Sequence, residues 1–148
     1  MKRLAGYALL CLLFFSGCQT APMPGNTSGA LAQVKVNGSN PEKVFATVEQ
    51  VFEGAGFRLA SSTPDLLVFE RAGTQMDAVK YGDWDGTKIM MRAKVSAEGR
   101  GAEMVLQCRV AAVRNYRESL ETEVLVWRGY QREYQSLMNQ VRDRLASP

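Results

Sequence analysis

The sequence predicts an α+β domain, an antiparallel sheet of about four to five strands with two helices packed on one face. Three observations lead to this fold class. Apolar residues recur at helical spacing after Asn40 and again near the C-terminus, and the segment between alternates polar and apolar residues between turn-forming stretches. The predicted order is β-α-β-β-β-β-α, in a single domain over residues 31–146 of the 148-residue chain.

The first strand and the first helix follow from local sequence. Residues 33–36 alternate as a half-buried strand does. Asn40 before Pro41 is typical of a helix start, because the Asn side chain caps free N–H groups and proline fits the first turn. We therefore expect a helix over 41–53. Its buried face is formed by Val44, Val48, Val51 and Phe52.

Two hairpins are expected in the middle of the chain. Strands at 57–60 and 66–70 flank a turn of Ser, Thr, Pro and Asp, and strands at 88–96 and 102–113 flank a turn around Gly99. The last of these strands has one apolar face, which indicates an antiparallel sheet covered on one side. That face carries Met104, Leu106, Cys108 and Val110, whereas Gln107 and Arg109 point the other way.

An amphipathic helix is predicted from about residue 128 onward. Its apolar positions are Tyr130, Tyr134, Leu137, Met138, Val141 and Leu145. The preceding segment, 120–127, fits either a strand or an earlier start of this helix, and we favour a short strand or an irregular segment. The order of elements over 31–145 resembles the helix-grip domains of bacterial envelope lipoproteins. That resemblance is one of topology and implies a fold without an activity.

Residues 1–17 are predicted to be an export signal peptide. Lys2 and Arg3 form a basic start, and every residue from 4 to 15 except Gly6 is apolar or aromatic. Such a run matches the apolar core of a secretory signal and is shorter than the ~20 residues of a membrane span.

The next residues, Phe15-Ser16-Gly17-Cys18, resemble the lipobox of bacterial lipoproteins, with Phe15 where Leu is usual. The resemblance implies cleavage between Gly17 and Cys18 and attachment of diacylglycerol and a further acyl chain such as palmitate to Cys18. An ordinary signal peptide with an incidental cysteine is the alternative. Because Gln19 and not Asp follows, similarity to lipoproteins of two-membrane cells implies the periplasmic face of the outer membrane.

Residues 18–30 would then be the lipidated cysteine and a flexible tether. Their Pro, Gly, Ser and Thr content is too polar to order itself, and a coil of this length has an r.m.s. reach of roughly 20 Å. The domain is therefore expected to stay close to the membrane surface.

Composition narrows the classes of function. The formal charge of +3 becomes +1 once Lys2 and Arg3 are removed, which argues against nucleic-acid binding. The chain has no histidine, the commonest general base and metal ligand. We therefore expect no enzyme, no metal and no cofactor. With Cys11 in the signal peptide and Cys18 lipidated, Cys108 is the one remaining thiol and is expected to be a buried structural residue.

Asp83, Trp84 and Asp85 are weak candidates for contact residues. Together with Asp77 they form the densest carboxylate cluster and echo part of a calcium loop, although the sequence Asp85-Gly86 is equally typical of a turn, which we favour. A second weak candidate is an anion-binding patch. It would consist of Arg109, Arg114 and Arg117, for which a solvated sheet edge is the preferred interpretation.

The leading functional hypothesis is a membrane-anchored, non-catalytic module that binds another envelope protein. A second is a carrier or sensor of a hydrophobic ligand held between the sheet and the C-terminal helix. Its pocket would be lined by Met90, Met91, Met104 and Met138, which ordinary core packing also explains. A third is a hydrolase that uses Asp77, Asp83 and Asp85.

Overall fold

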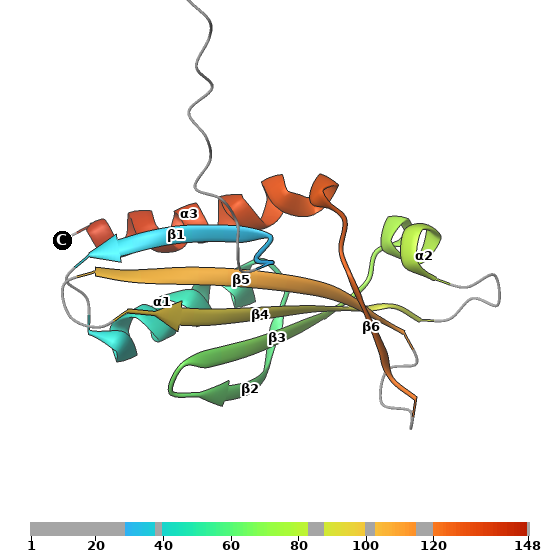
Figure 1. The fold of residues 1–148 in the computed structure, drawn as a ribbon, viewed down its shortest axis with the longest axis horizontal. Coiled ribbons are helices and arrows are strands. Elements are labelled where there is room, and N and C mark those ends of the chain that lie inside the picture. Colours follow the sequence, from blue (N-terminus) through green and yellow to red (C-terminus); the bar gives the residue numbers. More distant parts are fainter. Residues whose placement is uncertain (1–28, 38–39, 83–87, 100–102, 115–119, 148) are drawn as a thin grey trace, which may run out of the picture.

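The computed structural model describes residues 29–37, 40–82, 88–99, 103–114 and 120–147 and confirms the predicted α+β fold (Figure 1). Within these residues six strands form one antiparallel sheet, accompanied by three α-helices and a short 3-10 helix. The elements are β1 (Ala32–Asn37), α1 (Pro41–Gly54), β2 (Arg58–Thr63), β3 (Leu66–Ala72), α2 (Gln75–Tyr81), β4 (Met90–Glu98), β5 (Glu103–Arg114), β6 (Thr122–Leu125), η1 (Arg128–Tyr130) and α3 (Gln131–Ala146).

The strand order is β1-β5-β4-β3-β2, and β6 also pairs with β5. The long strand β5 pairs with β4 along one edge and with two short strands, β1 and β6, along the other. Its first half pairs with β1, from Asn37 opposite Glu103 to Ala32 opposite Cys108. Its second half pairs with β6, from Leu125 opposite Ala111 onward. β1 and β6 therefore lie end to end along β5, and their junction is where α3 departs from the sheet (Figure 1).

The hydrophobic core lies between one face of the sheet and the helices α1 and α3. The predicted apolar faces of both helices and of β5 are buried there, as expected. Aromatic contacts join the layers: the rings of Phe52 on α1 and Phe69 on β3 stack with centroids 4.8 Å apart, and Phe57 meets Tyr134 of α3 edge-on at 6.1 Å. Each such buried side chain contributes about 1.5–3 kcal/mol, so packing is the main source of stability.

The start of α1 is built as its sequence predicts. The Asn40 side chain accepts a hydrogen bond from the Glu42 N–H at 3.0 Å, and Pro41 occupies the first turn. The helix ends at Gly54, one residue beyond the predicted end, and Gly56 follows with φ +85°, a conformation that favours glycine.

Two elements differ from the sequence prediction. Helix α2 was not predicted, because it has seven residues and only Asp77 and Tyr81 are buried. The segment 120–127 contains a four-residue strand, β6, in agreement with the short strand or irregular segment favoured there, although the predicted element order did not include it. Helix α3 is preceded by η1 instead of starting at Arg128. Among the described residues no helix is both long and apolar enough to cross a bilayer. The predicted signal peptide, the lipobox-like residues and the candidate contact residues 83–85 lie outside the described residues.

Candidate functional site: a basic groove beside β1

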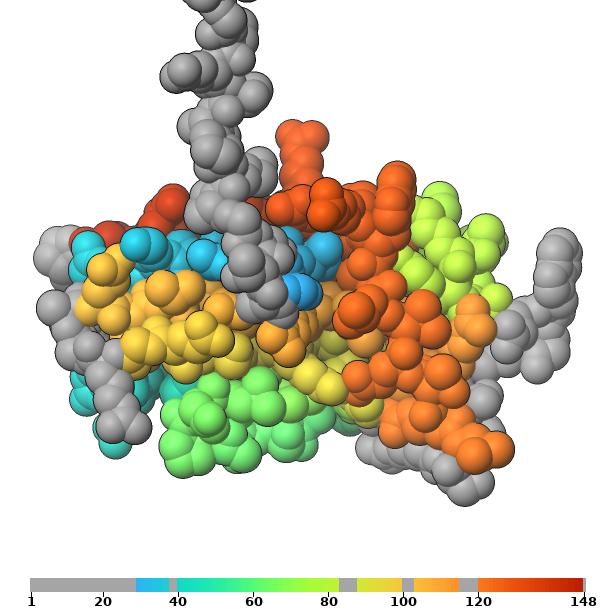
Figure 2. All heavy atoms as spheres, in the orientation of Figure 1, coloured from blue at the N-terminus to red at the C-terminus, as the bar shows by residue number. Residues whose placement is uncertain are grey.

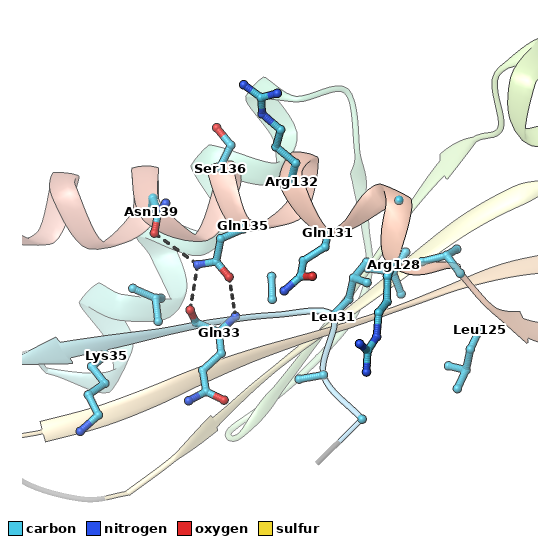
Figure 3. Close-up of a pocket in the computed structure, with 17 residues that line it drawn as sticks. Leu31, Gln33, Lys35, Leu125, Arg128, Gln131, Arg132, Gln135, Ser136 and Asn139 are labelled. Carbon is cyan, nitrogen blue, oxygen red and sulfur yellow. Dashed lines mark hydrogen bonds between the residues drawn. The ribbon is translucent and has the colours of Figure 1, made fainter. Parts of the chain in front are cut away.

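An open groove of about 1100 Å³ runs between β1 and α3, at the junction of β1 and β6 (Figure 3). We call it the β1–α3 groove. Three of its lining residues are cationic and none is acidic. The cations are Lys35, Arg128 and Arg132, and the polar neighbours are Gln33, Gln131, Gln135, Ser136 and Asn139. Leu31 and Leu125 add apolar surface to its floor. The groove is therefore suited to an elongated ligand with negative charge.

The wall formed by β1 is a strand edge. The Gln33 N–H donates to Gln135 Oε1 at 3.2 Å, and Gln135 Nε2 donates to the Gln33 carbonyl at 2.9 Å (Figure 3). The Gln135 side-chain amide therefore forms the two hydrogen bonds that the backbone of a neighbouring strand would form. The same Nε2 also donates to Asn139 Oδ1 at 3.3 Å. Because backbone groups alternate along a strand, the N–H and C=O of Lys35 open to the same side as those of Gln33.

The wall formed by α3 is a polar stripe. Arg132, Gln135 and Asn139 are spaced by three and four residues, which places them on one helix face. Arg128, in η1, extends this stripe toward β6. In Figure 3 the Arg128 side chain reaches down past Leu31, whereas Arg132 points away from the sheet.

The positive charge of the groove is only partly offset. Lys35 forms an exposed ion pair with Glu103 at 2.9 Å, which is weak in water. Within the described chain no ion pair is recorded for Arg128 or Arg132. The two arginines are therefore the charges most available to a ligand.

A second polar cluster centres on Asp77 and joins α2 to the start of α3. Asp77 is almost fully buried, and its carboxylate accepts from the Tyr130 hydroxyl at 2.6 Å and from the Thr74 N–H at 2.7 Å. The Thr74 hydroxyl lies 2.9 Å from the same carboxylate, and the Arg71 guanidinium lies 3.7 Å away. Thr74 and Asp77 form a capping box for α2.

These contacts determine the protonation of the pair. Burial by itself raises the pKa of Asp77, but the hydrogen bonds from Tyr130 and Thr74 and the charge of Arg71 bring the pKa below its ordinary value of 3.8. Burial and the adjacent carboxylate raise the pKa of Tyr130. At neutral pH Asp77 is a charged acceptor and Tyr130 a neutral donor, an arrangement that fastens α2 to α3.

On the opposite face of the sheet, Arg92 of β4 sits among three carboxylates. Its guanidinium lies 2.6 Å from Glu70, 2.7 Å from Glu121 and 2.7 Å from Glu123. Lys94 adds a further ion pair to Glu123 at 2.9 Å. Because these two cations and three carboxylates are paired with one another, the network connects β3, β4 and the region of β6 and is not an open binding site.

Cys108 and the described arginines of the predicted anion patch lie in β5. Cys108 is fully buried, and burial raises the pKa of its thiol to about 12, as suits a structural residue. Arg109 is exposed, whereas Nε of Arg114 donates to the Tyr81 carbonyl, and alternation along β5 puts the two arginines on opposite faces. The anion patch is therefore not assembled by these two residues, and Arg117 lies outside the described chain.

The space between sheet and C-terminal helix is filled with side chains. Met91 and Met138 are completely buried in the core, and Met104 nearly so, whereas Met90 is half-buried. Ordinary packing thus accounts for these methionines. The described part of the chain contains no group of three or more acidic or cysteine side chains that could hold a metal ion. Asp83, Trp84 and Asp85 lie outside it.

Sequence reasoning did not find the β1–α3 groove. The stripe of Arg128, Arg132, Gln135 and Asn139 was visible as the polar face of a helix, but nothing in the sequence places β1 beside it. No family model matches the chain, and no curated protein matches its sequence.

Proposed function

We propose that this chain is a membrane-anchored bacterial envelope lipoprotein whose domain binds another envelope protein without catalysis. The observation that carries the proposal is the β1–α3 groove, which combines a strand edge, a row of amide side chains and three cations with no carboxylate. The lipobox-like residues ending at Cys18 supply the anchor, and Gln19 favours the periplasmic face of the outer membrane.

The ligand we propose for the groove is an extended, acidic segment of the partner protein. An extended peptide can pair with a strand edge, and the outward backbone groups of Lys35 provide such an edge. Acidic side chains on the peptide would meet Arg128 inside the groove and Arg132 at its outer rim, and both arginines have the fixed planar geometry suited to carboxylates. Opposite charges also speed the encounter, and the positive charge of the groove disfavours segments rich in lysine and arginine.

The proposed tether would join the domain at the groove. Gly29, the first described residue, lines the groove, so the tether from Cys18 ends at its rim. With a reach of roughly 20 Å, the tether keeps the groove near the membrane surface, where a membrane protein's exposed segments are found.

The two alternative functions have less support. The interior that would hold a hydrophobic ligand is occupied by fully buried side chains such as Met91 and Tyr134. For hydrolysis, Asp77 would need to activate water, but its carboxylate is engaged by Tyr130, Thr74 and Arg71. These engagements favour a structural role for Asp77.

The anchor is tested by intact-mass measurement of the protein from membranes, wild type beside Cys18→Ala. The expected mature chain begins at Cys18 and carries the mass of acyl chains, which the variant lacks. A chain cleaved elsewhere and unmodified would withdraw the lipoprotein proposal.

The groove is tested by placing a photo-crosslinking amino acid at Ser136, which is exposed at its rim, in the membrane-bound protein. We expect a crosslink to one acidic segment, identified by mass spectrometry, and a loss of binding of at least about tenfold in Arg128→Glu/Arg132→Glu. Lys43→Glu, an exposed charge reversal on α1, is the matched control and should leave the crosslink unchanged. Crosslinks that ignore the arginine reversals, or that map to segments without acidic residues, would contradict the proposal.

A further inference from the structure

Large apolar side chains are exposed where α2 meets the end of β6. Val79 is 75% exposed, Leu125 70%, Trp127 68% and Met76 60%. Such side chains are normally turned inward, and a group of them at one end of a small domain marks a contact surface. We call Met76, Val79, Lys80, Leu125, Trp127 and Arg128 the α2–β6 surface.

Contacts between the two elements make this surface continuous. The Lys80 ammonium lies 5.9 Å from the centre of the Trp127 ring and 4.8 Å from that of Tyr130. Along α2, successive residues turn by about 100°, so Lys80, Met76 and Val79 follow one another around the helix away from the buried Asp77. The Trp127 ring lies directly on Gly129, where an added Cβ would be 2.5 Å from it.

The described chain begins beside this surface. Gly29 lines the same groove as Leu125, Arg128 and Gly129, and Gly129 carries the Trp127 ring. Figure 2 shows the β6–α3 segment between β1 and α2. A tether from Cys18 to Gly29 would thus join the domain close to this surface.

The charges around the surface suit an anionic membrane. Lys80 and Arg128 are exposed and basic. Described acidic residues near Lys80 and Arg128 in the chain are engaged: Asp77 accepts from Tyr130 at 2.6 Å, Glu133 pairs with Arg71 at 3.0 Å, and Glu123 pairs with Arg92 at 2.7 Å. Tryptophan and aliphatic side chains bordered by lysine and arginine are the composition that rests in the headgroup layer of a bilayer.

We propose that the α2–β6 surface docks on the anionic membrane to which the chain is tethered, with Trp127 in the headgroup layer. This inference rests on the lipid anchor of the proposed function and deepens it. Docking fixes the orientation of the domain, so the adjoining β1–α3 groove opens along the membrane surface and selects partner segments that lie close to the bilayer.

The test uses the mature lipidated protein in vesicles of phosphatidylethanolamine and phosphatidylglycerol. The chain has two tryptophans, so Trp84→Phe leaves Trp127 as the single fluorescent tryptophan. We expect brominated acyl chains to quench Trp127 emission and aqueous acrylamide to quench it poorly. Lys80→Glu should lower the ratio of docked to free domain roughly fivefold or more, since each basic residue near an anionic surface contributes that factor. Val79→Glu should abolish quenching by the brominated lipid.

Two controls separate docking from general effects. Leu120→Glu changes an equally exposed apolar residue that precedes β6, and Lys43→Glu reverses a charge on α1; both should retain the quenching of Trp127. Circular dichroism checks that each variant is folded. Phosphatidylcholine vesicles, which lack net charge, should weaken the quenching of the wild type.

Three results would overturn the inference. Trp127 open to acrylamide in a protein that carries its acyl chains would mean that the anchor exists but this face does not dock. Trp127 shielded from both quenchers, increasingly at high protein density, would identify the surface as a protein–protein interface. A protein without acyl mass would remove the anchor itself, and with it the reason for docking.

Discussion

The hydrogen bond between Asp77 and Tyr130 should hold α2 against the domain, and Asp77→Ala tests this. The substitution removes the capping box of α2, which is worth about 1 kcal/mol, and the charge-assisted bond from Tyr130, worth about 1.5–3 kcal/mol. It also takes away the buried partner of the Arg71 guanidinium, which keeps Glu133. We expect the free energy of unfolding to fall by about 3 kcal/mol.

The assay is urea denaturation of a Cys18→Ala protein, followed by circular dichroism, for Asp77→Ala, Tyr130→Phe and the double variant. Tyr130→Phe should cost about 1.5–3 kcal/mol, because the buried carboxylate loses its shortest hydrogen bond. The double variant should cost clearly less than the sum, since both changes break the same bond. Amide exchange in α2 should accelerate in both single variants, which identifies the helix as the part released.

Small and additive changes in the free energy of unfolding would contradict this role of the Asp77–Tyr130 hydrogen bond. If each single substitution changed the free energy of unfolding by less than about 0.5 kcal/mol, within the range of ordinary surface changes, Asp77 would not fasten α2. A large effect without coupling between the two positions would assign the stability to the capping box alone.

Three further predictions concern other parts of the domain. The carboxylates of Asp77 and Glu123 have pKa values below their ordinary 3.8 and 4.5. Their contribution to the stability of the fold is therefore complete above these ordinary values and is lost as pH falls through the lower pKa values of the folded state. The urea midpoint should drop in acid, and it should drop by less in Asp77→Ala. Cys108, with a pKa of about 12, should resist thiol reagents at about pH 8 in the native protein and react fully in urea, and labelling without urea would contradict its burial. Arg92→Met removes the cation shared by three carboxylates and should lower the free energy of unfolding by about 3 kcal/mol, measured by urea denaturation; an unchanged midpoint would show the network to be dispensable.

The elements that the sequence predicts well are those whose signals are local. Helix α1 has its cap at Asn40 and a regular apolar stripe, and the core residues of β5 from Met104 to Val110 lie at every second position, although Gln107 on the other face is also buried. In these segments the spacing of the core residues equals the period of the secondary structure, so the pattern identifies the element and the face that meets the core.

Helix α2 escaped prediction because its buried face is not apolar. Its inward residues are Asp77 and Tyr81, and its outward residues include Met76 and Val79, which reverses the usual pattern. The box formed by Thr74 and Asp77 was the available signal, yet its meaning depends on Tyr130, which lies far along the chain. The β1–α3 groove could not be predicted for the same reason, because it forms only when β1 packs beside α3, which lies far along the chain.

The division of one β5 edge between β1 and β6 has a consequence for the order of folding. β6 follows β5 closely in the chain and can pair as a local hairpin, whereas Ala32 must find Cys108 across most of the domain. Such non-local pairing is slow, so β1 is expected to join late. Until then half of the β5 edge offers unpaired backbone groups to any neighbouring strand. When newly made chains are crowded together, that strand can be the β1 of another copy, which makes a strand-swapped dimer the expected product of faulty folding.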